Sequence, residues 1–341
     1  MKIKKNILSK RFLFHNKNLE KNNKARNIHN KLVLNPHYRK EIKSCNNCGL
    51  TNFYLFSEIE RNNLPINFLI CISCGLVSSQ HHLSENFIIQ YYKEIYNKFK
   101  SDRSAVEAFK VRTHLESYSY KRFNFVKNNL KENFDSISIV MEPGCNDGCN
   151  LLPYFRNKIE TFGCDFNKEA INQGRQAGIN IFEGEIEKLI QTKKKADLII
   201  LSHLIAHIPN INDFLKKVEV LLAPDGYVYV ETPSFRYWGN KKWWQKRNKD
   251  LLNFLQFEFV YIFEKKTLID LMKNNNFIPV IVNEKSQGIF KKNNGEKNLE
   301  IQLNYGKQVL TNLKTIEDNY LKHLSSFIHI LSKIKFFIKN F

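Results

Sequence analysis

The sequence predicts an α/β protein whose main domain is an open, doubly wound sheet, preceded by a small cysteine-containing domain and followed by helices. Three observations lead to this prediction. From Ser136 onward, short apolar strands alternate with helices, a pattern typical of parallel βαβ units. Two closely spaced cysteine pairs lie before this region. After Gly295, only a helical periodicity remains.

Each element of the α/β region has a local reason. The segments 138–141 and 197–201 are almost wholly apolar, as strands covered on both faces are. Helix 168–177 ends at Gly178, and helix 214–222 ends before the Pro-Asp-Gly turn at 224–226. The same alternation predicts strands at 161–164, 179–182, 227–231 and 278–282 and a helix at 266–274.

Composition excludes two broad classes of protein. Of the 341 residues, 43% are hydrophobic, which is enough for a large core and excludes a wholly disordered chain. No stretch approaches the roughly 20 uncharged apolar residues of a transmembrane helix. The first 40 residues lack the apolar segment of a secretory signal, and the cysteine pattern suits a reducing compartment, so we expect a cytoplasmic protein.

The formal net charge is +20, which suggests a nucleic-acid partner. The Lys excess is spread along the chain, however, and accompanies many Asn, Ile and Phe residues, as AT-rich codons produce. We favour this second interpretation, because diffuse charge reports on solubility more than on function.

Composition and residue pattern divide the chain into five segments. A basic extension covers residues 1–43, the cysteine domain 44–82, a helical segment 83–131, the α/β domain 132–290 and a helical extension 291–341. The last helix, Tyr320–Phe341, has an apolar face with lysines beside it. We expect it to dock on its own domain or on a second copy of the chain, in preference to a membrane surface.

The cysteine domain contains two Cys-x2-Cys-Gly motifs, Cys45/Cys48 and Cys71/Cys74. Two such motifs present four thiolates in a tetrahedron, which is a closed structural metal site. The remaining cysteines lack this arrangement, and we interpret them as small packing residues.

A loop of the form Glu142-x-Gly144-x-Asn146-x-Gly148 directly follows the first strand. In an open α/β sheet, ligands bind at such loops, beyond the carboxyl ends of the strands. The dinucleotide pattern needs two further glycines, and a phosphate-binding loop needs Gly-Lys-Ser/Thr. Neither is present, so the loop predicts a ligand without phosphate.

S-adenosylmethionine is such a ligand. Gly144 and Gly148 allow the backbone to approach its amino-acid end, Asp165 after the second strand can accept both ribose hydroxyls, and Glu185 after the third can accept the adenine amine. A segment after the fourth strand then lines the pocket. The candidate cofactor residues are Glu142, Gly144, Asn146, Gly148, Asp165, Phe166, Glu185, Ser202, His203 and Leu204.

In these features, residues 136–283 resemble the class I S-adenosylmethionine-dependent methyltransferases. Further similarity lies in 202–209, Leu221–Gly226 and Val230–Pro233, which look like the family's fourth and fifth strands. The resemblance implies a Rossmann-like seven-stranded sheet and methyl transfer. Asn146 replaces a glycine of the family pattern, and Asn tolerates the left-handed backbone conformation.

Residues 45–99 resemble the zinc ribbon fused ahead of some of these enzymes, among them sugar C-methyltransferases and methyltransferases of surface-polysaccharide pathways. This resemblance implies a structural Zn²⁺ on Cys45, Cys48, Cys71 and Cys74. It also implies a small-molecule or nucleotide-linked acceptor, and we expect a carbohydrate.

Catalytic residues are less sharply indicated. The sugar enzymes carry a Tyr-x-Glu-His motif, of which only Glu258 is retained here, because Gln256 and Phe259 replace the Tyr and His. His207 is our candidate general base, since a neutral imidazole suits deprotonation near pH 7. The alternative is a histidine that only packs at a helix start.

The stretch Phe235–Arg247 is aromatic and basic and follows the fifth strand. It suits stacking on sugar rings, stacking on nucleotide bases, or a lid packed on the core. Two rivals to the carbohydrate enzyme therefore stay open. One is an RNA methyltransferase that uses the ribbon and the basic surface, and the other is a degenerate methyltransferase fold that serves as a binding subunit.

Overall fold

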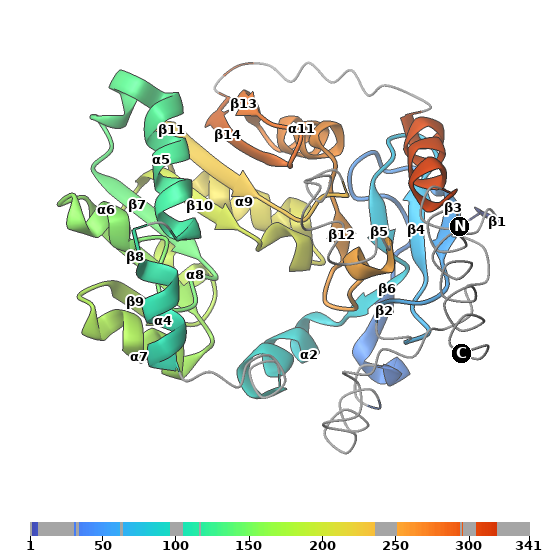
Figure 1. Cartoon of the computed structure of the whole chain (residues 1–341), viewed down its shortest axis with the longest axis horizontal. Helices are drawn as coiled ribbons and strands as arrows, with labels where there is room; N and C mark the ends of the chain where they lie inside the picture. The colour runs from blue at the N-terminus through green and yellow to red at the C-terminus, as the bar shows by residue number, and fades with distance from the viewer. Residues whose placement is uncertain are drawn as a thin grey trace, which may run out of the picture.

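The computed structural model describes residues 2–5, 31, 34–61, 64–95, 105–115, 117–235, 251–293, 295 and 305–318. Within these ranges the chain builds a large mixed sheet flanked by helices and a smaller sheet that contains the cysteine motifs (Figure 1). No helix in the described ranges is both long and apolar enough to span a bilayer.

The large sheet has seven strands in the order β13-β14-β11-β10-β7-β8-β9. Its bounds are β7 Ile139–Pro143, β8 Glu160–Asp165, β9 Asn180–Glu183, β10 Ala196–Ser202, β11 Leu222–Glu231, β13 Phe277–Val282 and β14 Gln287–Lys292. Strands β7 to β11 are parallel, and β14 is antiparallel to both of its neighbours. Strands β8 and β9 lie on one side of β7, and β10 and β11 lie on the other. This change in the order of the strands opens a crevice at the carboxyl ends of β7 and β10.

Helices cover both faces of this sheet, as the predicted doubly wound fold requires. Strand β10 shows the reason, because Ile199 and Leu201 pack with α8 (Glu187–Ile190), α9 (Ile211–Leu221) and α11 (Lys265–Asn274). Leu198 and Ile200 point to the other face, which is covered by α5 (Tyr118–Leu130), α6 (Leu152–Arg156) and α7 (Lys168–Gln176). A strand buried on both faces must be apolar throughout.

The small sheet, which we call the ribbon sheet, has the order β1-β3-β4-β5-β12. Its strands are β1 Lys2–Lys5, β3 Asn52–Ser57, β4 Phe68–Cys71, β5 Val77–Ser79 and β12 Tyr261–Ile262. Strand β12 comes from the region that the sequence assigns to the α/β domain, and it pairs antiparallel with β5. A segment from the α/β region therefore forms an edge strand of the ribbon sheet.

After the ribbon, β2 (Arg39–Glu41) pairs with β6 (His81–Leu83), and α2 (Glu85–Gln90) continues as a π-helix over Tyr91–Ile95. Helix α4 (Ala105–Thr113) then leads to α5. Strands β1 and β2 lie in the region expected to be a basic extension.

A helix over residues 305–318 docks on the ribbon. Its Val309, Leu310 and Leu313 share a core with Phe56 and Phe68. The glycine at 306 makes this contact close, because a Cβ there would lie 2.0 Å from the carbonyl oxygen of Cys71. The predicted terminal helix Tyr320–Phe341 lies outside the described residues.

The strand at 287–292 was not among the elements predicted from local pattern. The structure also starts β11 at Leu222, so the Pro-Asp-Gly segment expected to be a turn lies within a strand that carries a register irregularity against β10.

Candidate active site

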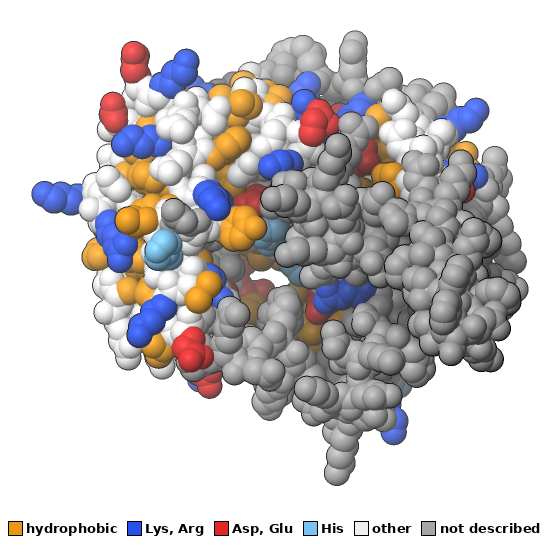
Figure 2. All heavy atoms as spheres, in the orientation of Figure 1, with side chains coloured by type: hydrophobic (Ala, Val, Ile, Leu, Met, Phe, Trp, Pro, Cys, Tyr) orange, Lys and Arg blue, Asp and Glu red, His pale blue; other side chains and the backbone are white. Residues whose placement is uncertain are grey.

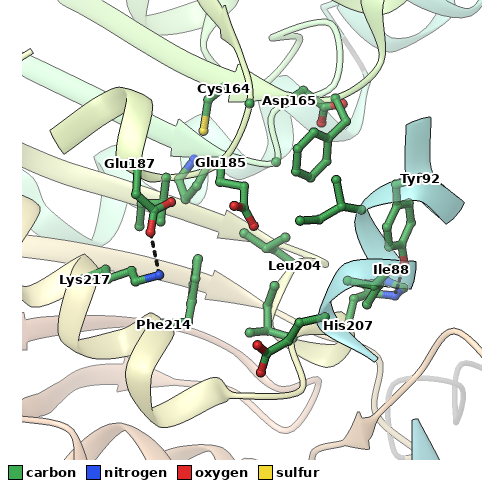
Figure 3. A pocket seen from close by; sticks show the side chains of 18 of the residues that line it. Ile88, Tyr92, Cys164, Asp165, Glu185, Glu187, Leu204, His207, Phe214 and Lys217 are labelled. Carbon is green, nitrogen blue, oxygen red and sulfur yellow. Dashed lines mark hydrogen bonds and ion pairs between the residues drawn. The ribbon is translucent and has the colours of Figure 1, made fainter. Parts of the chain in front are cut away.

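A cavity of about 790 Å³ opens at the carboxyl ends of β7, β8, β9 and β10. One wall comes from the loops after these strands, and the opposite wall comes from α2 and its π-helical continuation (Figure 3). Of the predicted cofactor residues, those on its wall are Gly144, Asn146, Asp165, Phe166, Glu185, Ser202, His203 and Leu204.

Asp165 is fixed by backbone amides of the loops around it. The amide of Asn146 donates to its Oδ2 at 2.8 Å, and the amide of Asn167 donates to its Oδ1 at 2.8 Å. Burial raises the pKa of Asp165, and these backbone hydrogen bonds oppose that shift. The carboxylate is thus held in one orientation on the cavity wall.

The glycine-rich loop needs left-handed backbone at three positions, with φ of +67° at Gly144, +53° at Asn146 and +71° at Gly148. A Cβ at Gly144 would lie 2.9 Å from the Leu204 side chain, so a glycine keeps this part of the wall clear. Asn146 adopts the conformation for which the related pattern uses glycine. Its side-chain Oδ1 is buried and has no hydrogen-bond partner within the described chain.

Glu142 and Gly148 do not lie on the cavity wall. Gly148 contacts Ile179 and Ile181, where it lets the loop pack against β9. Glu142 is 1% exposed and accepts a hydrogen bond from Asn150 Nδ2 at 2.7 Å. Both residues therefore support the loop from behind.

A second network, of charged and polar side chains, lies at the end of β11. Arg122, from α5, pairs with Glu231 and donates to Asn150 Oδ1 at 3.1 Å. His203 Nε2 lies 3.6 Å from the Glu231 carboxylate. Burial alone would raise the pKa of Glu231, but the neighbouring His203 and Arg122 side chains lower it overall. His203 is anchored further by its amide, which donates to the Glu231 carbonyl at 2.7 Å.

The cavity wall formed by α2 and its π-helical continuation, which we call the α2 wall, places Tyr92 next to His207. The Tyr92 hydroxyl lies 2.9 Å from His207 Nδ1, and the same nitrogen lies 3.0 Å from the Glu258 carbonyl oxygen. Because a carbonyl only accepts hydrogen bonds, this contact places the ring proton on Nδ1 and leaves Nε2 as the proton-accepting nitrogen. Burial raises the pKa of Tyr92, and the nearby Glu258 charge raises it further, so its hydroxyl stays protonated.

The other candidate catalytic residue, Glu258, lies behind His207 and not on the cavity wall. Its contact with His207 is through the backbone. Its carboxylate Oε2 is buried with no partner within the described chain. Phe259, which stands where the related motif has histidine, packs edge-on against His207 with 5.1 Å between the ring centroids.

Sequence reasoning did not single out Tyr92 as a site residue. The available signal was its place in an aromatic helix directly after the cysteine domain. Helical spacing alone does not show which distant residue such a side chain contacts.

The structure brings all four predicted metal ligands together. The sulfur atoms of Cys45, Cys48, Cys71 and Cys74 all lie within 4.8 Å of one another. In each knuckle, the amide of a left-handed glycine donates to the first cysteine carbonyl, Gly49 to Cys45 and Gly75 to Cys71. Hydrogen bonds from the neighbouring thiols lower the pKa of Cys71. This set of donors suits a tetrahedral Zn²⁺.

The aromatic and basic stretch predicted beside the acceptor lies outside the described residues after Phe235. Phe235 itself is 2% exposed and packs against Phe56 and Phe254.

Glu142 gives a pH-dependent prediction. Burial raises its pKa from 4.5 to about 8, because desolvation disfavours the charged form more than Asn150 and Arg122 favour it. Between these two values the unfolded chain has lost a proton that the native chain keeps, so the native state loses stability as pH rises. We expect the free energy of unfolding of wild type to fall relative to Glu142→Gln between pH 5 and 8.

Urea unfolding of both proteins across this range measures the difference. Glu183→Gln, at an exposed position at the end of β9, is the matched control. Its free energy of unfolding relative to wild type should not change with pH across this range. A difference between wild type and Glu142→Gln that does not change with pH would contradict the assignment.

Comparisons with known proteins agree with this architecture. Residues 117–280 match the family model described as "Methyltransferase domain". The curated C-methyltransferase NovU of Streptomyces niveus is 24% identical over 174 residues, which cover 50% of this chain but 38% of that protein. The match thus spans well under two thirds of the relative's length.

Solved methyltransferases show distant likeness. Magnesium protoporphyrin IX methyltransferase from Synechocystis is 12% identical, with a TM-score of 0.42 over 61% of this chain and 98% of its own. The plantazolicin methyltransferase BamL is 15% identical, with a TM-score of 0.44 over 69% of this chain and 88% of its own. Over residues 117–280 the chain therefore carries a methyltransferase domain, and its seven-stranded sheet is the one that the resemblance to the class I S-adenosylmethionine-dependent enzymes implies.

Proposed function

We propose that the protein transfers a methyl group from S-adenosylmethionine to a small acceptor, and that this acceptor is a carbohydrate. One observation carries the proposal. A single cavity has the loop-held carboxylate of Asp165 on one wall and the Tyr92–His207 pair on the opposite wall. The proposed cofactor-binding and proton-accepting groups therefore face the same cavity.

The described residues fit the cofactor. The bare Cα of Gly144 leaves room for its amino-acid end. Asp165 can accept hydrogen bonds from the two ribose hydroxyls, and Glu185 can accept one from the adenine amino group. When bound, the cofactor supplies an activated sulfonium methyl group.

The chain's own part in the reaction is positioning and proton transfer. The Glu258 carbonyl holds His207 in the tautomer whose Nε2 accepts a proton, and Tyr92 braces the same ring. With Phe259 in place of the motif histidine, His207 is the base in this wall that can deprotonate an acceptor hydroxyl.

Three observations support a small, hydroxyl-bearing acceptor over RNA. The cavity wall near Tyr92 carries Glu85 and Asn210, which can hydrogen-bond hydroxyl groups. Among the described lining residues the single cationic side chain is Lys217, which is paired with Glu187, while the carboxylates are Glu85, Asp165, Glu185, Glu187 and Asp213. On the described part of the face in Figure 2, Lys and Arg are scattered and interrupted by acidic and apolar side chains.

We further propose that the cysteine cluster holds a structural Zn²⁺. Four thiolates use every position of a tetrahedral ion, so none remains for water or substrate. Such thiolates persist in a reducing compartment, which supports a cytoplasmic location.

The cofactor site is tested by Asp165→Ala. Loss of the acceptor for the ribose hydroxyls should weaken S-adenosylhomocysteine binding at least tenfold, or about 1.4 kcal/mol. Calorimetric titration measures the affinity, and Glu183→Ala, at the end of the next strand, should leave it unchanged. Equal affinities in wild type and Asp165→Ala would show that the site is misplaced.

The proton acceptor is tested by His207→Gln. We expect kcat to fall by roughly 10²- to 10⁴-fold, the usual contribution of a general base, while cofactor affinity stays within about twofold. Tyr92→Phe should cost less, because the Glu258 carbonyl still holds the imidazole. The assay is methyl transfer to a panel of nucleotide-linked sugars. A His207→Gln enzyme with wild-type kcat would exclude this role.

The metal is tested by Cys74→Ala. Wild type should contain about one zinc per chain, as a closed four-thiolate site binds one ion, and Cys74→Ala should lose it. Cys149→Ala, which removes a buried thiol outside the cluster, should keep its zinc. Elemental analysis distinguishes these outcomes, and zinc-free wild-type protein would overturn the proposal.

A further inference from the structure

The first cysteine knuckle is hydrogen-bonded to the methyltransferase domain through two adjacent asparagines. Asn46 and Asn47 lie between the ligands Cys45 and Cys48. Neither is a metal ligand, and each contacts a different element of the large domain.

Asn46 reaches the cavity wall. Its Nδ2 donates to the Pro209 carbonyl at 3.4 Å and to the Tyr261 hydroxyl. Tyr261 is 1% exposed, and its hydroxyl donates to the same Pro209 carbonyl at 2.7 Å. The backbone carbonyl of Asn46 accepts from Asn212 Nδ2 at 2.9 Å. Pro209 lies on the cavity wall two residues after His207.

Asn47 instead reaches α11, away from the cavity. Its Nδ2 donates to the Thr267 carbonyl at 3.5 Å, and its Oδ1 accepts from Asn274 Nδ2 at 3.1 Å. The Asn47 backbone carbonyl accepts from the same Asn274 Nδ2 at 2.6 Å. Neither Thr267 nor Asn274 lines the cavity. The chain thus offers two neighbouring side chains of the same type with different targets.

We propose that Asn46 and Tyr261 are positioning residues that couple the metal-binding knuckle to the His207–Asn210 wall of the cavity. The inference rests on the proposed function in taking this wall as the acceptor side. A metal that orders residues 45–48 then also orders the Pro209 carbonyl, because Asn46 is held between two ligands. A bound ion would influence the cavity only through the chain, by way of the knuckle backbone and the Asn46 and Tyr261 side chains.

Because these groups are buried, loss of their hydrogen bonds should destabilise the cavity wall more than the metal-binding knuckle. Pro209 and Tyr261 are buried, so a Pro209 carbonyl that lost these donors would be left without compensation from water. The cost falls on the wall segment, since the knuckle keeps its four sulfur ligands and its hydrogen bonds to α11.

The test is hydrogen–deuterium exchange on the metal-loaded full-length protein, read in two peptides. In Asn46→Ala, the peptide covering residues 204–214 should exchange at least fivefold faster, while the peptide covering 265–275 stays as in wild type. Asn47→Ala should show the reverse pattern. Tetrahedral Co²⁺ absorption, with cobalt in place of zinc, checks that the metal site is intact in each variant.

Tyr261→Phe gives a second route that leaves the knuckle unchanged. It should loosen residues 204–214 as Asn46→Ala does. The double variant should add little, because Asn46 acts on the Pro209 carbonyl mainly through the Tyr261 hydroxyl, its direct contact with that carbonyl being the longer one at 3.4 Å. If Asn46→Ala loses its metal, Tyr261→Phe decides alone. Wild-type exchange at 204–214 in Tyr261→Phe, or equal loosening of both peptides in both Asn variants, would overturn the inference.

Exchange does not depend on catalysis, so this result stands apart from the proposed function. If the protein also transfers methyl groups, Asn46→Ala should alter kcat or the acceptor KM without changing affinity for S-adenosylhomocysteine. A protein that fails to bind S-adenosylhomocysteine, yet shows the predicted exchange pattern, would refute the function and keep the coupling.

Discussion

Two backbone hydrogen bonds at Val260 join the ribbon sheet to the cofactor-side loops, and the geometry of the cavity depends on them. The Ser79 amide donates to the Val260 carbonyl at 2.9 Å, and the Val260 amide donates to the Ala206 carbonyl at 2.8 Å. Residue 260 is therefore a link between β5 and the turn that carries His207. Together with the core that the two sheets share, it fixes the helix that follows the ribbon relative to the ends of the strands.

This link explains why the cysteine domain is more than an appendage. It places α2 across the crevice, so that Tyr92 meets His207 and the cavity is closed on a side that the large sheet leaves open. The same chain segment contributes β12 to the ribbon sheet and the Glu258 carbonyl to His207. The helix over 305–318 then covers the second knuckle from outside.

The features that local pattern predicted are those with a local cause. The strand at 197–201 is almost wholly apolar because both faces are covered. Asp165 is the last residue of its strand, and the cysteine spacing itself forms the knuckles. The features that it did not predict depend on distant partners. The run 257–263 is apolar apart from Glu258, but its composition does not show that two of its residues complete the ribbon sheet. Likewise, nothing near Asn46 in the sequence indicates that its partners are Pro209 and Tyr261.

The central claim is that the cofactor and the acceptor meet between Asp165 and the Tyr92–His207 pair. A crystal structure of the zinc-loaded protein with S-adenosylhomocysteine tests it most directly. Our account predicts that the ribose hydroxyls contact Asp165 and that the thioether sulfur faces Tyr92 and His207. A cofactor bound elsewhere, or one whose sulfur points away from the α2 wall, would contradict it.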